Sequence, residues 1–459
     1  MKKLSKICDA ADWFDPEFNG VVKKELCEEP RFHRKQWEFA MIYLALEKLG
    51  MLKNDKLGLS LGGGNERVLY SIANHINKLI VTDLYDTDTT WDCAKTGDPN
   101  EFIRSSKPFP IDDDKIEAMR MDMRYLDFED NKFDFCYSSC AIEHIGGFED
   151  FVQHLNEVYR TLKEGGVYVF TTEFQFGSAT IKDPNNYIFS PSFINYLIDN
   201  CKLTPVTNPD VSLTDHVANM PFPSNVVNLM SDRGSHISNG IMENFPHLGL
   251  LRGKYPFTSI LLILRKETAK KEKLKIAFNG FDSSKKFTDN GVKSYASLLE
   301  KSDFSLNPFS MLPNGVSYYY LDHSEFFKND KRSSEDNSLF HTDYFWLGNS
   351  KRIFNIRIEV NASNTFEENV IQFRIHRYAT LNSEKVHAVF EKNINVNKSE
   401  LINERIILKA DEEHNYAFLA KMTSGGCSIK DIKITSVPLE NSEEAESVDS
   451  NMELIEEIK

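Results

Sequence analysis

The sequence lacks paired cysteines, long apolar runs and an excess of basic residues. Its seven cysteines form no CxxC pair and show no regular spacing, which argues against a disulfide framework and a cysteine zinc site. The longest purely aliphatic run, Ile260–Leu264, is far shorter than the roughly 20 residues of a membrane span. A formal net charge of -15 argues against nucleic acid as a partner, because phosphate neutralisation needs clustered lysine and arginine.

Signals for secretion and for metal binding are missing as well. Met1-Lys2-Lys3-Leu4 carries the charges of a signal peptide, but four charged residues between Lys6 and Asp15 interrupt the apolar segment that should follow. No group of His, Asp and Glu has the spacing of metal ligands. We therefore expect a soluble, cytoplasmic protein with no transmembrane segment and no metal site.

The length of 459 residues exceeds that of one ordinary core and predicts two domains with additional segments. We predict an N-terminal helical lid at 1–55, an α/β domain at 56–266 and a charged linker at 267–273. A β-sandwich is predicted at 274–438. The acidic tail, 439–459, is expected to be disordered.

Strands and helices alternate through the α/β domain, which is typical of a mostly parallel sheet that binds ligands at the carboxyl ends of its strands. The predicted strands are Leu57–Leu61, Leu79–Asp83, Phe133–Ser138, Val167–Thr172 and Ser259–Leu264.

The spacing of apolar residues along the sequence changes after the linker. Arg352–Val360 alternates strictly, with Phe354 and Ile356 among the inward positions, and several later segments follow the same pattern. Many short strands without intervening helices predict an antiparallel, jelly-roll-like sandwich. Such sandwiches commonly bind carbohydrate, so this part of the chain is a candidate carbohydrate-binding module.

A glycine turn organises the α/β domain. Gly62, Gly63 and Gly64 follow the first strand, and Asp83 ends the second. Glycine lets the backbone approach a ligand closely, and a carboxylate at a strand tip can accept hydrogen bonds from a ribose. A dinucleotide fingerprint would have a glycine at position 67, where Arg67 stands. With no pyrophosphate to hold, S-adenosylmethionine (SAM) is the better candidate cofactor.

Two further motifs follow in order: Asp122-Met123-Arg124-Tyr125-Leu126-Asp127-Phe128, and Ser138-Ser139-Cys140-Ala141-Ile142-Glu143-His144-Ile145. Together with the glycine turn and Asp83, they make residues 34–266 resemble the class I SAM-dependent methyltransferases, specifically the type 11 group that acts on small molecules and glycans. The resemblance implies a Rossmann-like α/β fold and SAM as the methyl donor.

The resemblance also implies residue roles in the cofactor site. Gly62 and Gly64, with Gly63 between them, would contact the methionine part of SAM. Asp83 would bind the ribose hydroxyls, and Leu84 would pack on adenine. The remaining implied cofactor contacts come from Asp122 and the Met123 backbone at the adenine and from Ser138 near the methionine end.

Two positions depart from the family pattern. Ser60 stands where many members have an acid, which leaves the partner of the SAM amino group open. Glu66 replaces the usual third glycine, which suggests a different packing of the turn.

For an alcohol acceptor, His144 is the candidate general base, with Glu143 orienting it or binding a divalent metal. The alternative is that the pair only caps and anchors the next helix. Trp37 could contact substrate as part of a lid with the basic cluster at 33–35, or could simply pack a helix against the sheet. Further substrate-binding candidates are Glu173 and His216.

The leading hypothesis is O-methylation of a sugar in a bacterial surface glycan of the O-antigen or capsule type. The sandwich or the acidic tail would hold the glycan or a protein of the glycan-assembly machinery. One alternative is a methyltransferase for a small metabolite, with the sandwich serving oligomerisation. Another is a non-catalytic scaffold with a degenerate methyltransferase fold.

Overall fold

The computed structural model describes residues 3–439 apart from 90, 184–185, 224–245, 253–254, 268–275, 302–303, 307–317, 320–337, 343–344, 348, 363–368, 380–385, 397–399, 412–413 and 426. The chain forms two compact units. Unit 1 contains Met1–Pro221, Pro246–Gly249 and Pro256–Thr288, and unit 2 contains the remaining residues. Nearly all of the predicted acidic tail lies outside the described residues.

Unit 1 is built on a sheet that includes the strand order β12-β6-β5-β2-β3-β4. Neighbouring strands from β6 to β4 pair in parallel, whereas β12 runs antiparallel to β6. All five predicted strands are present. The strands are β2 (Leu57–Leu61), β3 (Lys78–Asp83), β4 (Ile116–Arg120), β5 (Phe133–Ser139), β6 (Leu162–Gln175) and β12 (Tyr255–Arg265), with β1 (Lys6–Ile7) and β9 (Thr204–Pro205) paired to β12.

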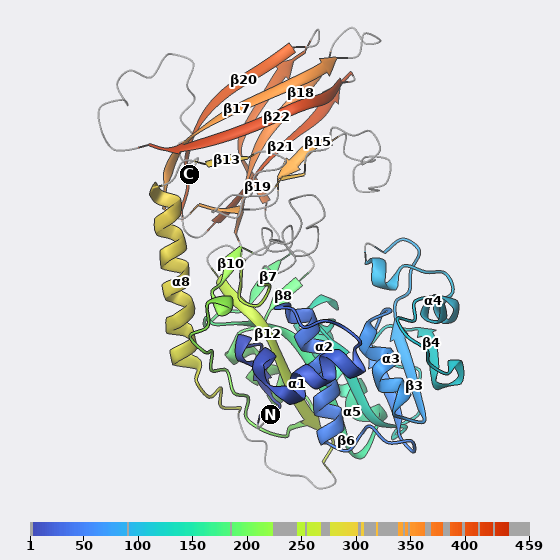
Figure 1. The fold of residues 1–459 in the computed structure, drawn as a ribbon. Coiled ribbons are helices and arrows are strands. Elements are labelled where there is room, and N and C mark those ends of the chain that lie inside the picture. The colour runs from blue at the N-terminus through green and yellow to red at the C-terminus, as the bar shows by residue number, and fades with distance from the viewer. Residues whose placement is uncertain are drawn as a thin grey trace. The chain divides into compact units, whose positions relative to one another are not determined.

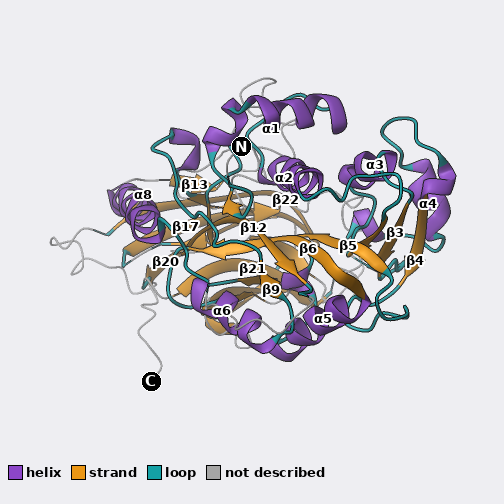
Figure 2. Ribbon diagram, turned by 90° about the horizontal axis from the view of Figure 1, so that it is seen from below, coloured by secondary structure: helices purple, strands orange, loops and turns teal. Residues whose placement is uncertain are grey.

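Helices cover both faces of this sheet (Figure 2), as the α/β prediction requires. Along β3, Leu79 and Val81 belong to the core under one helical layer, while Ile80 belongs to the core under the other. The first layer contains α2 (Arg34–Lys48) and α3 (Arg67–Asn74), and the second contains α5 (Phe148–Thr161) and α6 (Pro191–Asn200).

The N-terminal segment is part of unit 1 rather than a separate body. It contains η1 (Ala10–Phe14), α1 (Pro16–Gly20) and η2 (Val21–Glu25) in addition to α2. The ring of His33 caps α2 by accepting a hydrogen bond from the Lys35 amide at 3.1 Å. Gly50, with φ of +71°, follows the end of the helix.

Several short elements complete the α/β part of the chain. The hairpin of β7 and β8 matters for the site because it carries Asn186. These elements are α4 (Pro99–Ser105), η3 (Asp92–Ala94), η4 (Asp113–Lys115), η5 (Ile142–His144), η6 (Val217–Asn219), β7 (Ile181–Asp183), β8 (Asn186–Ile188), β10 (Phe222–Pro223) and β11 (Leu250–Arg252).

Unit 2 contains two antiparallel sheets (Figure 1). Phe354 of β17 in one sheet and Phe418 of β21 in the other meet with ring centroids 4.9 Å apart, and both belong to one core. The predicted sandwich is therefore confirmed. The first sheet is β13 (Phe304–Leu306), β22 (Cys427–Pro438), β17 (Lys351–Ala362) and β20 (Glu400–Lys409); the second is β14 (Tyr318–Tyr319), β15 (Ser338–Thr342), β21 (His414–Ser424), β18 (Val370–Ala379) and β19 (Val386–Asn395), with β16 (Phe345–Trp346) paired to β21.

One helix, α8 (Phe281–Lys301), differs from the prediction that residues after 274 form strands alone. Asn290-Gly291, a pair typical of turns, lies inside it. Phe281, its first residue, packs against Phe174 of β6 with ring centroids 6.3 Å apart. This tertiary contact, which local propensity cannot reveal, joins the first turn of the helix to unit 1. No helix in the described ranges has the length and apolarity to cross a membrane.

Candidate functional site

The glycine turn lies at the carboxyl end of β2 and requires glycine for two reasons. Gly62 and Gly64 have φ of +62° and +48°, in the left-handed region. A Cβ on Gly62 would approach the Ala141 methyl to 2.5 Å, and one on Gly63 would collide with the hydroxyl of Ser60. Ser60 is fully buried beneath the turn. The Ser60 hydroxyl therefore packs directly under the turn, which is why position 63 must be a glycine.

Asp83 ends β3 next to the same turn. One of its carboxylate oxygens accepts from the Gly64 amide at 2.9 Å, and the other accepts from the Leu84 amide at 2.7 Å. Burial raises the pKa of Asp83, although both hydrogen bonds oppose that shift. Each oxygen keeps a second lone pair for a ribose hydroxyl. Leu84 is 60% exposed and offers an apolar surface beside the carboxylate.

The loop between β3 and α4 contacts the turn, which sequence reasoning missed. A Cβ on Gly64 would lie 2.6 Å from the Cys93 carbonyl oxygen. Two residues earlier, the Trp91 ring lies 4.9 Å from the His144 ring. This loop therefore links the cofactor turn to the predicted base, and the tryptophan in a polar stretch was the signal that could have indicated it.

The second motif lies after β4. Asp122 accepts hydrogen bonds from the backbone and guanidinium of Arg124, which lower the pKa of Asp122. Met123 is buried, and its Sδ lies 3.7 Å from the Cβ position of Gly62. Ser138 is fully buried in β5. Met123 thus reaches the glycine turn, whereas the predicted adenine contact of Asp122 stays a prediction.

Glu143 and His144 lie in η5, directly after the carboxyl end of β5. Glu143 is buried, and its Oε2 accepts from the Thr172 hydroxyl at 3.0 Å. Burial raises the pKa of Glu143. Its Oε1 is also buried and has no hydrogen-bond partner among the described residues. His144 is exposed, so a substrate can reach its ring.

Cationic residues of α2 contact buried carboxylates of the same helix and of the neighbouring sheet. Arg34 pairs with Glu173 of β6. The Lys35 amine lies 3.0 Å from Glu38 Oε2 and 3.2 Å from Glu66 Oε1. Burial would raise the pKa of Glu38, but Lys35 and Arg34 hold it below its ordinary value. Two residues of the predicted basic cluster, Arg34 and Lys35, are therefore paired with carboxylates inside unit 1.

Glu173, a predicted substrate residue, has a second partner from the β7–β8 hairpin. The Asn186 amide donates to Glu173 Oε2 at 2.6 Å. The Asn186 carbonyl oxygen and Nη1 of Arg34 are buried without partners among the described residues. Sequence reasoning did not identify Asn186, because only the hairpin brings it to the end of β6.

Trp37 and His216 are engaged elsewhere. Trp37 is fully buried, and its indole N–H donates to Asp12 Oδ2 at 2.7 Å. This favours the core role over the lid role. The His216 ring lies 5.7 Å from Phe14 and 5.4 Å from Phe32, and its Nδ1 accepts from the Ala218 amide. For both residues the substrate contact stays a prediction.

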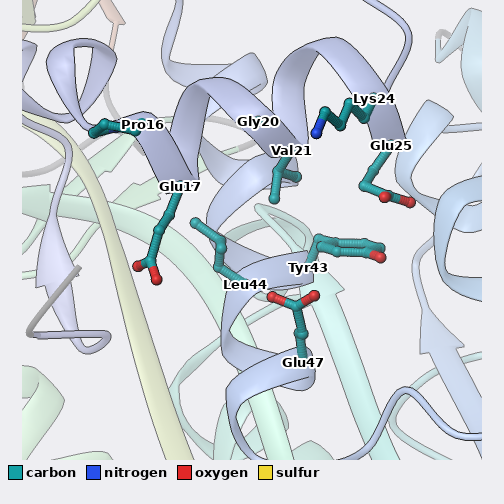
Figure 3. A pocket seen from close by; sticks show the side chains of 9 residues that line it. All are labelled: Pro16, Glu17, Gly20, Val21, Lys24, Glu25, Tyr43, Leu44 and Glu47. Carbon is teal, nitrogen blue, oxygen red and sulfur yellow. The ribbon is translucent and has the colours of Figure 1, made fainter.

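An open pocket of about 300 Å³ lies between α1, η2 and α2 (Figure 3). Carboxylates of Glu17, Glu25 and Glu47 line it together with Tyr43. None of its lining residues is a predicted site residue. Within the described ranges, no group of three or more His, Cys, Asp or Glu side chains is arranged to hold a metal ion.

These features fit an adenosyl cofactor with an amino acid end. The turn admits no side chain at Gly62–Gly64, Asp83 keeps acceptor capacity beside it, and Glu66 Oε2 is a buried acceptor without a partner among the described residues. In the class of enzymes that uses SAM, the cofactor supplies a methyl group activated by the sulfonium.

Comparison with known proteins gives one family match. Residues 59–170 match a family model described as a methyltransferase domain. No curated protein matches the chain in sequence. The family match covers the glycine turn, Asp83, the motif at Asp122 and the Glu143-His144 pair.

Many solved structures are similar to part of this chain at low identity. The [4+2]-cyclase SpnF is 13% identical, with 58% of this chain and 100% of that chain covered and a TM-score of 0.36. Geranyl diphosphate C-methyltransferase from Streptomyces coelicolor A3(2) is 17% identical, with 58% of this chain and 91% of that chain covered and a TM-score of 0.34. A SAM-dependent methyltransferase from Aquifex aeolicus is 11% identical, with 48% of this chain and 88% of that chain covered and a TM-score of 0.28.

Likenesses this weak carry no argument about activity, so the assignment depends on the family match and on unit 1 itself. The family match confirms the predicted methyltransferase domain and, with it, SAM as the methyl donor of the class. By its matched residues, strand order and glycine turn, the α/β part of this chain belongs to the class I SAM-dependent methyltransferases.

Proposed function

We propose that the protein transfers the methyl group of SAM to a hydroxyl of a sugar in a bacterial surface glycan of the O-antigen or capsule type. The methyl group is already activated, so the protein mainly has to position the acceptor and remove its proton. The residues at the carboxyl ends of β5 and β6 are the candidates for both tasks.

The observation that carries this proposal is a set of buried polar atoms around Glu173. Arg34 Nη1 can donate, while Glu143 Oε1 and the Asn186 carbonyl oxygen can accept, and none has a partner among the described residues. A sugar hydroxyl both donates and accepts, so a neutral polyol satisfies this mixed set.

His144 would take the proton of the attacking hydroxyl. It is exposed at the end of β5, and imidazole is the side chain most often used for this task. Glu143, the preceding residue, would orient the acceptor hydroxyl through its free Oε1. In this assignment bound SAM would supply the activated methyl group, and the His144 imidazole would take up the proton that the acceptor hydroxyl loses on methylation.

The antiparallel sandwich of unit 2 supports a glycan rather than a free sugar as the acceptor, since folds of this kind commonly bind carbohydrate. The net charge of -15 favours a neutral polymer over nucleic acid. We propose that the sandwich or the acidic tail holds the glycan or a protein of the glycan-assembly machinery.

The test is mass spectrometry of glycans from the source organism with and without an intact copy of this protein. Loss of a single O-methyl sugar supports the proposal. Unchanged glycans, together with methyl transfer to a small metabolite in extract, would contradict it. Absence of heat on titration with S-adenosylhomocysteine (SAH) would indicate a scaffold instead.

In vitro, Asn186→Ala should raise KM for the glycan and leave SAH affinity unchanged, because in this proposal Asn186 binds the acceptor and not the cofactor. Asn200→Ala is the matched control, since this exposed asparagine lies at the end of α6.

A further inference from the structure

Glu66 has an unusual environment for the first residue before a helix. It is the N-cap of α3, yet its side chain makes no capping hydrogen bond. Its Oε1 accepts from the Lys35 amine at 3.2 Å. Its Oε2 is buried without a hydrogen-bond partner among the described residues. A buried carboxylate oxygen left unsatisfied is costly, so a ligand donor at this position would recover free energy.

Lys35 connects Glu66 to the carboxyl edge of the sheet. Its amine lies 3.0 Å from Glu38 Oε2 and 3.2 Å from both the carbonyl and the hydroxyl oxygen of Ser139, the last residue of β5. β5 neighbours β2, whose end carries the glycine turn. The Glu66 amide also donates to the Gly63 carbonyl at 3.2 Å. The ion pair therefore lies beside the turn.

We propose that Glu66 and Lys35 form the subsite for the amino acid end of SAM, with Glu66 Oε2 accepting from the α-ammonium and the Lys35 amine donating to the α-carboxylate. This inference rests on the proposed SAM-dependent function. It supplies the acceptor that Ser60 cannot provide. The Lys35 amine has three protons and four acceptors, so its two contacts with the uncharged Ser139 oxygens can be exchanged for a ligand carboxylate.

The electrostatics of the pair agree with this role. Burial raises the pKa of Glu66 to about 7, against the opposing effect of Lys35. Among the described residues, the other charged or titratable groups around Glu66 are Glu38 on α2, Asp83 at the end of β3, Cys93 in the following loop and Tyr137 of β5. An ammonium group at Oε2 favours the carboxylate, so ligand binding below neutral pH must release a proton.

The experiment compares two ligands by calorimetry on the full chain. SAH carries the amino acid end, whereas 5′-methylthioadenosine carries the adenosyl group without it. Glu66→Gln and Lys35→Met should each weaken SAH binding by roughly tenfold or more, because each removes a charged hydrogen bond, and should leave methylthioadenosine binding unchanged. Glu17→Gln and Lys48→Met are matched controls, since Lys48 of α2 pairs with Glu17 at the surface.

The wild-type protein gives a second readout that needs no variant. Between pH 6 and pH 8, SAH affinity should rise by about tenfold as Glu66 ionises, while methylthioadenosine affinity stays constant. The subsite would be overturned if the ratio of SAH affinity to methylthioadenosine affinity did not change with pH or with the substitutions. Equal losses of affinity for both ligands in folded variants would also overturn it. Failure of the wild type to bind either ligand would overturn the SAM-dependent function itself.

Discussion

Asp83 illustrates how one side chain can serve both the fold and the ligand. Its two oxygens already bind the Gly64 and Leu84 amides, so the carboxylate fixes the turn before any cofactor arrives. The remaining lone pairs can accept hydrogen bonds, and we predict that ribose hydroxyls donate them. Substitution of Asp83 should therefore lower ligand affinity, although the side chain is only partly exposed.

We expect Asp83→Ala to weaken SAH binding by roughly ten- to a hundredfold, because hydrogen bonds to a charged group contribute about 1.5–3 kcal/mol. Isothermal calorimetry measures the change, and thermal unfolding reports whether the turn stays folded. Asp86→Ala is the control, because the Asp86 side chain lies three residues further on and is 55% exposed. Unchanged SAH affinity in the Asp83 variant would contradict the ribose assignment.

His144 should matter for turnover alone. We expect His144→Ala to reduce methyl transfer by roughly 10²- to 10⁴-fold, the usual contribution of a general base, while SAH affinity stays at the wild-type level. A radiolabel transfer assay and calorimetry separate the two effects. His75→Ala provides the comparison, since His75 pairs with Glu25 on a different part of unit 1. If the His144 variant turned over at the wild-type rate, His144 would not be the base. The Glu143-His144 pair would then only cap and anchor the next helix.

At the scale of elements, α2 is held to the sheet by buried charges as well as apolar packing. Glu38 is 1% exposed and accepts from Ser259 of β12 in addition to its pairing with Lys35. Ion pairs inside a protein cost desolvation free energy, but removing one partner leaves the other charge buried and alone.

Glu38→Ala should therefore lower the free energy of unfolding by about 3–5 kcal/mol, which urea denaturation can measure. Glu47→Ala, on the same helix but in the open pocket of Figure 3, should change it little. An equal effect of the two substitutions would show that the buried charges do not stabilise α2.

His154 joins α5 to the sheet. Its Nδ1–H donates to the Met123 carbonyl at 2.9 Å, and its Nε2 accepts from the Tyr168 hydroxyl at 2.9 Å, which requires the neutral ring. Burial lowers the pKa of His154 to about 4. In the unfolded chain the ring protonates near pH 6.5.

Because the folded-state pKa of His154 is the lower one, its contribution is complete above about pH 6.5 and is lost as the pH falls toward 4, at a cost of roughly 3 kcal/mol. Urea unfolding at a series of pH values should show this loss. His154→Gln should reduce the slope in that window, and an identical slope in the variant would assign the acid sensitivity to other groups.

At the scale of the whole molecule, each unit has its own hydrophobic core. Unit 1 buries apolar residues on both faces of its sheet, and unit 2 buries them between its two sheets. Separate cores favour separate cooperative transitions.

Scanning calorimetry of the full chain should therefore show two transitions, and SAH should raise only the one that belongs to unit 1. At a hundredfold excess over Kd, the ligand should stabilise that unit by about 2.7 kcal/mol. Methylthioadenosine is a useful comparison because it lacks the amino acid end. One transition, or equal shifts of both, would contradict independent unfolding.

The sequence by itself determined the features that depend on neighbouring residues. The glycine turn, Asp83 at a strand end and the alternation of Phe354, Ile356 and Ile358 could be predicted because backbone strain and side-chain period act locally. These local patterns were sufficient for the α/β domain, the sandwich and the methyltransferase family.

Only the tertiary structure decided which distant side chains meet. Arg34 and Glu173 are separated by 139 positions, and Ser259 and Glu38 by 221, yet each pair is in contact. No local period encodes such pairs, because their geometry follows from how the helices dock on the sheet. The proposed role of Glu66 could not be predicted from the sequence for the same reason. Its partner Lys35 lies on α2, and only the docking of α2 brings the two charges together beside the glycine turn.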